Sequence, residues 1–149
     1  MLYYAAHMDE EGADLVSAYT NPALRGYVEE WKDRPGDSGF VAVTADGRAV
    51  GAAWLRVIPN NPLYQFVEPG TPELAIAVMP EFLGGGLGTL LLRQLLLVAR
   101  DVHRAVVLSV RASNPARRLY ERLAFVTVAS ITNRVGTLSY VMRADLSYP

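Results

Sequence analysis

Apolar residues alternate with turn signals along most of this chain, and the pattern predicts several strands. Two β-prone apolar runs, 38–44 and 49–58, flank Asp46-Gly47. Because Asp-Gly between such runs is a strong hairpin signal, these runs predict two antiparallel strands. Further short apolar runs predict strands at 2–6, 74–79, 105–111, 125–131 and 138–142.

Helical patterns occupy much of the remaining sequence. Segment 87–100 carries leucine on nearly every side and follows a glycine cluster, which predicts a turn and a buried helix. A helix at 22–31 is predicted by Asn21 as its cap and Pro22 in its first turn. Further helices are predicted at 12–19, either separate from 22–31 or forming one broken helix with it, and at 114–123, with an internal loop at 59–72.

The order of these elements predicts the fold class. Antiparallel hairpins stand before and after one strand-helix-strand unit, so the chain is predicted to be α+β with a mixed sheet. Its 149 residues, 51% of them hydrophobic, fit a single domain over 1–149. A domain of this size buries about 70% of the surface that its unfolded chain exposes.

Composition excludes several classes of protein. The chain has no cysteine, which excludes disulfide scaffolds, thiolate zinc sites and cysteine nucleophiles and suits a reducing compartment. Its formal net charge of −1 lacks the electrostatic footprint of a general nucleic-acid binder. The N-terminus has no basic leader, and no stretch approaches the roughly 18 apolar residues of a membrane span. The sequence therefore predicts a cytoplasmic protein that binds neither nucleic acid nor membrane.

A glycine cluster carries the clearest chemical signal. Gly84, Gly85, Gly86 and Gly88 join a predicted strand to a predicted helix. Glycine allows backbone conformations with positive φ, and the free N–H groups and positive dipole end of the helix face this turn. The cluster therefore predicts an anion-binding cradle, with a flexible turn that binds no ligand as the alternative.

Two nucleotide-binding motifs match this cluster poorly. A phosphate-binding P-loop needs Gly-Lys-Ser/Thr, and the only lysine of the chain is Lys32. The dinucleotide fingerprint needs glycine at its sixth position, where a frame that starts at Gly84 places Thr89. These mismatches make a nucleotide-binding protein the least favoured of the functions considered for this sequence.

Two segments resemble the acetyltransferases of the GNAT superfamily. Val78-Met-Pro-Glu-Phe-Leu-Gly-Gly-Gly-Leu-Gly-Thr-Leu-Leu is similar to their acyl-CoA motif, which runs Val-x-Pro, Arg or Gln, two residues, Gly-x-Gly or Ala and an apolar helix. Asn114-Pro-Ala-Arg-Arg-Leu-Tyr-Glu-Arg-Leu-Ala-Phe is similar to the family segment Asn-x-x-Ala-x-x-Leu-Tyr-x-x-x-Gly-Phe, one residue shorter than the commonest spacing. Together they cover roughly 73–128.

The resemblance implies a fold and a reaction. The fold would be a mixed, mostly antiparallel sheet of about six to seven strands, with helices on both faces and a central βαβ acyl-CoA unit. The reaction would be direct transfer of an acetyl group from acetyl-CoA, without a metal, to a primary amine on a small molecule or peptide. A homodimer through the C-terminal strands would also fit the family. The main alternative is a non-catalytic acyl-CoA-binding module.

The resemblance also implies roles for individual residues. Tyr120 would protonate the leaving thiolate, although a helix tyrosine of this kind is often only a core aromatic. Glu73 would be the general base for the amine, with Glu81 as a second candidate. Asn114 would contact the cofactor or cap the following helix, or both. Acetyl-CoA would be held at Ile76, Ala77, Val78, Gly84, Gly85, Gly86, Leu87, Gly88, Thr89, Asn114 and Tyr120.

The sequence departs from the family at three positions. Leu83 stands where Arg or Gln is usual, so backbone N–H groups at 84–89 would do most of the pyrophosphate binding. Ala124 replaces the usual glycine before the phenylalanine. Ser109 stands where bacterial ribosomal-protein alanine N-acetyltransferases, which segment 108–114 resembles, carry a glutamate base. Because serine cannot replace that base unaided at neutral pH, a ribosomal-protein substrate is not expected.

The acceptor pocket would be built from the N-terminal helices and the loop at 59–72. Its candidate lining residues are aromatic, with packing in the core as the alternative role. They are Tyr27, Trp31, Trp54, Tyr64 and Phe66.

Overall fold

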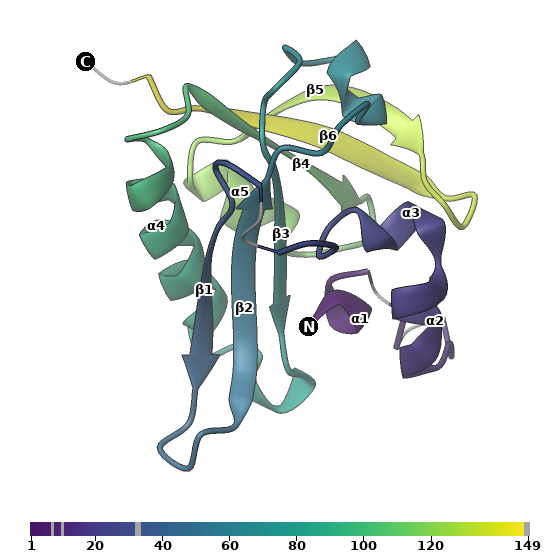
Figure 1. The fold of residues 1–149 in the computed structure, drawn as a ribbon, viewed down its shortest axis with the longest axis vertical. Helices are drawn as coiled ribbons and strands as arrows, with labels where there is room; N and C mark the ends of the chain where they lie inside the picture. The colour runs from purple at the N-terminus through teal and green to yellow at the C-terminus, as the bar shows by residue number, and fades with distance from the viewer. Residues whose placement is uncertain (7, 10, 32–33, 148–149) are drawn as a thin grey trace.

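One mixed sheet organises the molecule (Figure 1), for which the computed structural model describes residues 1–6, 8–9, 11–31 and 34–147. The strands lie in the order β1-β2-β3-β4-β6-β5, and only the β3–β4 pair is parallel. The expected α+β fold with a mostly antiparallel sheet is therefore confirmed. The strands are β1 Ser38–Val43, β2 Ala49–Arg56, β3 Glu73–Val78, β4 Ala105–Arg111, β5 Val126–Thr132 and β6 Leu138–Asp145.

Helices cover both faces of this sheet. The long helix α4 packs on one face, and the N-terminal helices pack on the other (Figure 1). The helices are α1 Leu2–Ala5, α2 Leu15–Thr20, α3 Pro22–Arg25, α4 Leu87–Ala99 and α5 Arg117–Arg122, with short 3₁₀ helices η1 Pro62–Gln65 and η2 Pro80–Phe82. The described part of the chain contains no helix that is long and apolar enough to cross a membrane.

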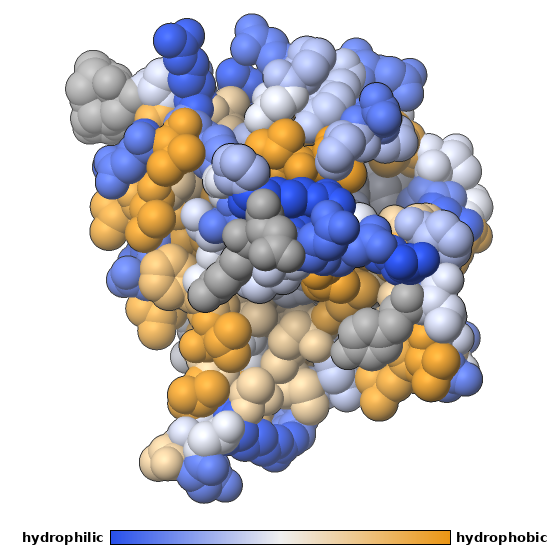
Figure 2. Space-filling model, in the orientation of Figure 1, coloured by the Kyte–Doolittle hydropathy of each residue, from blue (hydrophilic) through white to orange (hydrophobic). Residues whose placement is uncertain are grey.

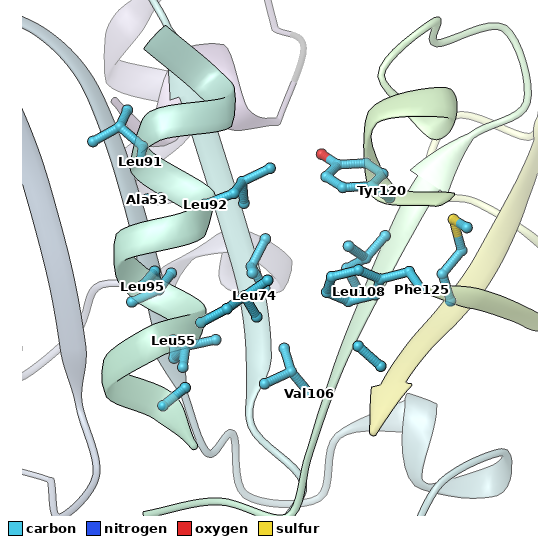
Figure 3. Close-up of a cluster of buried hydrophobic side chains, with 14 of the residues drawn as sticks. Ala53, Leu55, Leu74, Leu91, Leu92, Leu95, Val106, Leu108, Tyr120 and Phe125 are labelled. Carbon is cyan, nitrogen blue, oxygen red and sulfur yellow. The ribbon is translucent and has the colours of Figure 1, made fainter. Parts of the chain in front are cut away.

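Alternation along β2 places its side chains in two cores, one on each face of the sheet. Ala53 and Leu55 point to the α4 side, where they pack with a leucine row of that helix (Figure 3). Ala52 and Trp54 point to the opposite side, against the N-terminal helices. Both faces of this strand are therefore buried, which explains why its sequence is apolar at nearly every position.

The prediction of a strand at 2–6 is wrong, because these residues form helix α1. The amides of Ala5 and Ala6 donate to the carbonyl oxygens of Met1 and Leu2, both at 2.9 Å. Leu2 is buried in the N-terminal core. A short apolar run does not distinguish a strand from a buried helical turn by its period, and packing against the sheet decides between them here.

The helix predicted at 22–31 ends early, at Arg25. Its start is as expected, since the Asn21 side chain accepts from the Ala23 amide at 3.0 Å and Pro22 follows it. The buried Arg56 guanidinium then takes the carbonyl oxygens of Glu29 and Glu30 as hydrogen-bond acceptors. These contacts hold the segment in irregular turns.

The predicted loop at 59–72 covers part of the sheet. Helix η1 begins where the Asn61 side chain accepts from the Leu63 amide at 3.0 Å. Leu63 and Val67 then pack against Val107 of β4 and Val141 of β6. This segment therefore brings Asn61 beside the start of β3.

Several apolar side chains remain exposed on the molecular surface. Figure 2 shows one group of them at the left of the view, where β1 and α4 lie. They include Val41 and Val43 on β1 and Leu90 and Leu97 on α4.

Candidate active site

The central strands β3 and β4 pair at one point and then separate. Glu73 lies level with Val107, and the Val107 amide donates to the Pro72 carbonyl oxygen at 3.0 Å. No further pairing between these strands is present among the described residues. The sheet is therefore open between the carboxyl halves of its two parallel strands, the edge where α/β proteins commonly bind ligands.

Backbone polar groups of β3 face this opening. The Met79 amide donates to the Val50 carbonyl oxygen of β2 at 2.8 Å. The backbone N–H groups of successive residues in a strand point to opposite edges of that strand. The Ala77 amide therefore also faces β2, and the amides of Ile76 and Val78 face β4. Neither residue pairs with β4 among the described residues. Their amides can donate to a ligand that enters the opening, whereas Ala77 can offer only its side chain.

A cleft of about 850 Å³ runs through the opening and is lined from both faces of the sheet. Glu73, Tyr27 and Ser109 line it on the side of the N-terminal helices, and Tyr120 and Leu119 line it from α5. Its volume lies within the range of small-molecule sites. One continuous cavity therefore contains both residues that the sequence suggested for proton transfer.

Glu73 is a buried carboxylate at the closed end of the opening. Its Oε1 accepts from the Tyr27 hydroxyl, and its Oε2 accepts from Asn61 Nδ2 at 2.6 Å. Burial raises the pKa of Glu73, while the hydrogen bonds from Tyr27 and Asn61 partly offset that rise. A carboxyl group with a raised pKa accepts a proton more readily than an exposed one, as a general base requires. Asn61 could not be identified from the sequence, in which it reads as a loop residue before proline.

The second candidate base, Glu81, has different surroundings. It lies in η2 and forms an exposed ion pair with Arg48 at 2.5 Å. Hydrogen bonds from its own backbone amide and from Arg48 lower the pKa of Glu81. Glu81 is not among the residues that line the cleft.

Tyr120 is held by the way in which helix α5 ends. The amides of Ala124 and Phe125 donate to the carbonyl oxygens of Glu121 and Tyr120, both at 3.1 Å, which is a Schellman motif. The rings of Tyr120 and Phe125 pack edge to face, with their centroids 5.9 Å apart. Figure 3 shows the hydroxyl directed away from Phe125, toward α4. The ring is therefore a core aromatic, and it also belongs to the cleft.

The Tyr120 hydroxyl is a protonated group at neutral pH. Burial raises the pKa of Tyr120 to about 12. The hydroxyl has no hydrogen-bond partner among the described residues, so it is available to a ligand. It can donate a proton or a hydrogen bond, as a general acid requires.

The glycine turn has the conformation that its sequence predicts. Gly84 and Gly86 have φ of +81° and +83°, and Gly86 is the N-terminal cap of α4. The first amides of this helix, from Leu87 to Thr89, lack helical partners and form an anion-binding terminus. Gly84 and Gly88 line the cleft, whereas Gly85, Gly86, Leu87 and Thr89 are not among the lining residues.

Three more residues named from the sequence lie at this cavity. The Asn114 side chain accepts from the Ala116 amide at 2.9 Å before α5, so it caps that turn, and it also lines the cleft. Leu83 lines the cleft beside the glycine turn with 67% of its surface exposed. Ser109 is exposed on β4 and lines the cleft on the side of the N-terminal helices.

The five aromatic residues suggested for the acceptor pocket have separate positions. Tyr27 lines the cleft, and Trp54 Nε1 donates to the Tyr27 carbonyl oxygen at 3.0 Å beneath it. The Arg56 guanidinium lies over the Trp31 ring, with its Cζ 5.3 Å from the ring centroid. Tyr64 lies in η1 and packs against the core beneath this helix, and Phe66 is partly exposed. Of the five, only Tyr27 is among the lining residues.

Comparison with known proteins identifies the family. A model of the acetyltransferase (GNAT) family matches residues 7–125, and the chain belongs to this family. A mycothiol acetyltransferase from Saccharomonospora viridis is 37% identical over 102 residues, which cover 67% of this chain and 33% of that protein. The match therefore spans a third of that relative's length.

Solved structures of two acetyltransferases have the same fold. An N-acetyltransferase from Staphylococcus aureus Mu50 is 28% identical, with a TM-score of 0.66 and coverage of 84% of this chain and 77% of that one. A GCN5-related N-acetyltransferase from Kribbella flavida is 25% identical, with a TM-score of 0.61 and coverage of 76% and 70%. The resemblance inferred from the two sequence segments is confirmed.

Proposed function

We propose that this protein transfers an acetyl group from acetyl-CoA to a primary amine on a small molecule or peptide. The observation that carries the proposal is one cavity, lined by Glu73 from one face of the sheet and by Tyr120 from the other. Acetyl-CoA supplies the acetyl group as an activated thioester. The family supports acetyl transfer in general.

The residues of the cleft fit acetyl-CoA as a ligand. The amides of Ile76 and Val78 can hydrogen-bond its pantetheine arm, in the manner of an added strand. The amides at the start of α4 can bind its pyrophosphate, since Gly84 and Gly86 leave open space beside the backbone. Leu83 adds no charge there, so the backbone carries this contact.

Two side chains perform the proton transfers in this proposal. Glu73 takes the proton of the attacking amine, directly or through a water molecule, and its buried position keeps its pKa raised for that purpose. Tyr120 donates to the sulfur as the thiolate leaves. The amide of Ile76 or Val78 stabilises the negative charge that develops on the acetyl oxygen.

Replacing Tyr120 by Phe tests this assignment. We expect kcat to fall by about 10²-fold, because the transition state loses its proton donor, while acetyl-CoA affinity stays nearly unchanged. Release of free CoA with a panel of primary amines gives kcat, and calorimetry gives the affinity. A folded Tyr120→Phe protein with wild-type turnover would restrict Tyr120 to a packing role.

A non-catalytic acyl-CoA-binding module is the second candidate, favoured by Leu83 in place of the usual polar side chain. The same assay separates the two functions. A module would be stabilised by acetyl-CoA but would release no CoA with any amine.

Pairing of two copies through the C-terminal strands stays a prediction. Strand β5 lies at the edge of the sheet and exposes Val126 and Val128. Sedimentation of the protein across a concentration series measures whether it forms the homodimer.

A further inference from the structure

Two arginines at the rim of the cleft bind one carboxylate between them. Arg134 donates from Nη1 to Glu11 Oε2 at 2.9 Å and from Nη2 to Glu11 Oε1 at 2.8 Å. Arg111 donates to the same Oε1. Both also donate to the Ala6 carbonyl oxygen, at 2.9 Å from Arg134 and 3.3 Å from Arg111. A guanidinium fork on both carboxylate oxygens is the geometry with which arginine selects carboxylates.

These arginines lie on the acceptor side of the sheet. Arg111 follows Ser109 by two residues on β4, so both side chains point to the face that the N-terminal helices cover. Arg111 and Arg134 line the same cleft as Glu73. The glycine turn at 84–89 leads into α4, which packs on the opposite face. The arginine pair therefore faces the route of the amine rather than the pyrophosphate.

The local charges indicate exchange rather than addition of a ligand. Both oxygens of Glu11 already accept from Arg134, and one of them also accepts from Arg111. A second carboxylate beside Glu11 would be repelled by its negative charge. Glu11 is not among the residues that line the cleft, and its side chain is 19% exposed at the surface. An incoming carboxylate can therefore replace it while Glu11 moves into water.

We infer that Arg111 and Arg134 recognise a carboxylate on the amine acceptor, and that Glu11 occupies this carboxylate site when no acceptor is bound. The inference rests on the proposed function and names the class of its acceptor. The Cα of Arg111 lies about 13 Å along β4 from the level of Glu73, at roughly 3.3 Å per residue. This separation favours an acceptor whose amine and carboxylate are several bonds apart, such as a dipeptide, over an α-amino acid.

Acetylation of alanyl-alanine and of its C-terminal amide tests the inference, because these acceptors differ by one charge. We expect the wild type to prefer the free acid by about tenfold in kcat/KM, and Arg134→Gln to remove that preference. Arg143→Gln, at a position on β6 that does not line the cleft, is the matched control and should keep it. Equal rates for acid and amide in the wild type, or a preference that survives in Arg134→Gln, would overturn the inference.

Glu11→Gln separates recognition from a structural role of the same contacts. If Glu11 competes with the acceptor, its neutral variant should lower KM for the acid and leave that for the amide unchanged. If the contacts only fasten the N-terminal segment, Glu11→Gln and Arg134→Gln should impair both acceptors alike, which contradicts the inference. A fall in acetyl-CoA affinity in Arg134→Gln with an unchanged preference for the acid would contradict it too.

Failure of the proposed acetyl transfer can be distinguished from failure of the carboxylate site. In that case acetyl-CoA stabilises the wild type, but neither dipeptide is acetylated. The carboxylate site is then measured by calorimetric binding of N-acetyl-alanyl-alanine and its amide to wild type and Arg134→Gln. Acid binding about tenfold tighter than amide binding, and lost in the variant, supports the site; equal binding overturns it.

Discussion

Glu73 owes its proposed role to its neighbours. A carboxylate at the end of a strand is usually solvated, but here Tyr27 and Asn61 each donate to one of its oxygens, and the group is buried. Burial also raises the pKa of Tyr27 well above its ordinary value, so this hydroxyl stays a donor to the carboxylate. The hydrogen bonds fix the carboxylate in position while burial keeps it basic.

Glu73→Gln tests this base through the pH dependence of turnover. Because a base must be ionised, wild-type kcat/KM should fall as pH drops through the raised pKa of Glu73. The glutamine can accept from Asn61 and donate to the Tyr27 oxygen, so we expect a folded variant. It should lose about 10²-fold in kcat/KM at pH 7 and follow only the ionisation of the free amine. An unchanged pH profile would exclude Glu73 as the base.

The same substitution should change the pH dependence of stability. The pKa of Glu73 is raised in the folded protein, so its contribution to stability is fully present below the unfolded pKa and is lost as pH rises through the folded pKa. Urea unfolding of Glu73→Gln should lack that decline.

Ala124 carries a local strain that glycine would relieve. It occupies the left-handed position of the Schellman motif, with φ of 68°, which L residues other than glycine adopt at a cost. We expect Ala124→Gly to raise the free energy of unfolding by about 0.5–1 kcal/mol, measured by urea denaturation. Ala116→Gly, at φ of −60°, should instead lower stability, since there glycine adds only unfolded-state freedom. A destabilised Ala124→Gly protein would contradict this reading.

At the scale of elements, substitutions at two glycines can distinguish the effect of backbone strain from the effect of ligand binding. Gly84 and Gly47 have φ of +81° and +86°, and a Cβ at either meets no atom within 4 Å. Valine at either should therefore cost a similar amount of stability, about 1–3 kcal/mol. Only Gly84 lines the cleft, so only Gly84→Val should weaken acetyl-CoA binding, by about tenfold or more. Equal acetyl-CoA affinities in the two variants, measured by calorimetry, would exclude the turn from the site.

Features that depend on residues close in sequence were predictable, and features that depend on residues far along the chain were not. The hairpin around Asp46-Gly47 and the cap at Asn21 depend on neighbouring residues, and both are present as predicted. The early end of α3 depends on Arg56, which is far along the chain and fully buried with Asp37. An isolated arginine in a strand gives no sign of the carbonyl groups that it will bind.

The residues of the candidate site were likewise predictable only where a local sequence motif contains them. Local motifs indicated Tyr120, Asn114 and the glycine turn, because each belongs to a strand-turn-helix segment with its own residue pattern. The partners of Glu73 come from two other segments, and the arginine pair depends on contact between the N-terminal region and the β5–β6 turn. Such contacts follow from tertiary packing, which residue order alone does not specify.

At the scale of the whole molecule, the two parts of the sheet are joined weakly at its centre. Among the described residues, β3 and β4 pair only at Glu73 and Val107. The core between α4 and α5 joins the two parts on one side of the sheet. A ligand that enters the opening would therefore add hydrogen bonds where the sheet lacks its own.

Hydrogen exchange of three consecutive amides in β3 can detect this addition. Without ligand, the amides of Ile76 and Val78 should exchange quickly, because they face the opening, whereas the Ala77 amide is protected by its pairing with β2. Acetyl-CoA should slow exchange at Ile76 and Val78 more than at Ala77, in addition to raising Tm by mass action. A ligand that stabilises the protein while binding elsewhere would slow all three amides only through global unfolding. Uniform protection would therefore place acetyl-CoA outside the opening, and alternating protection would place it along the free edge of β3.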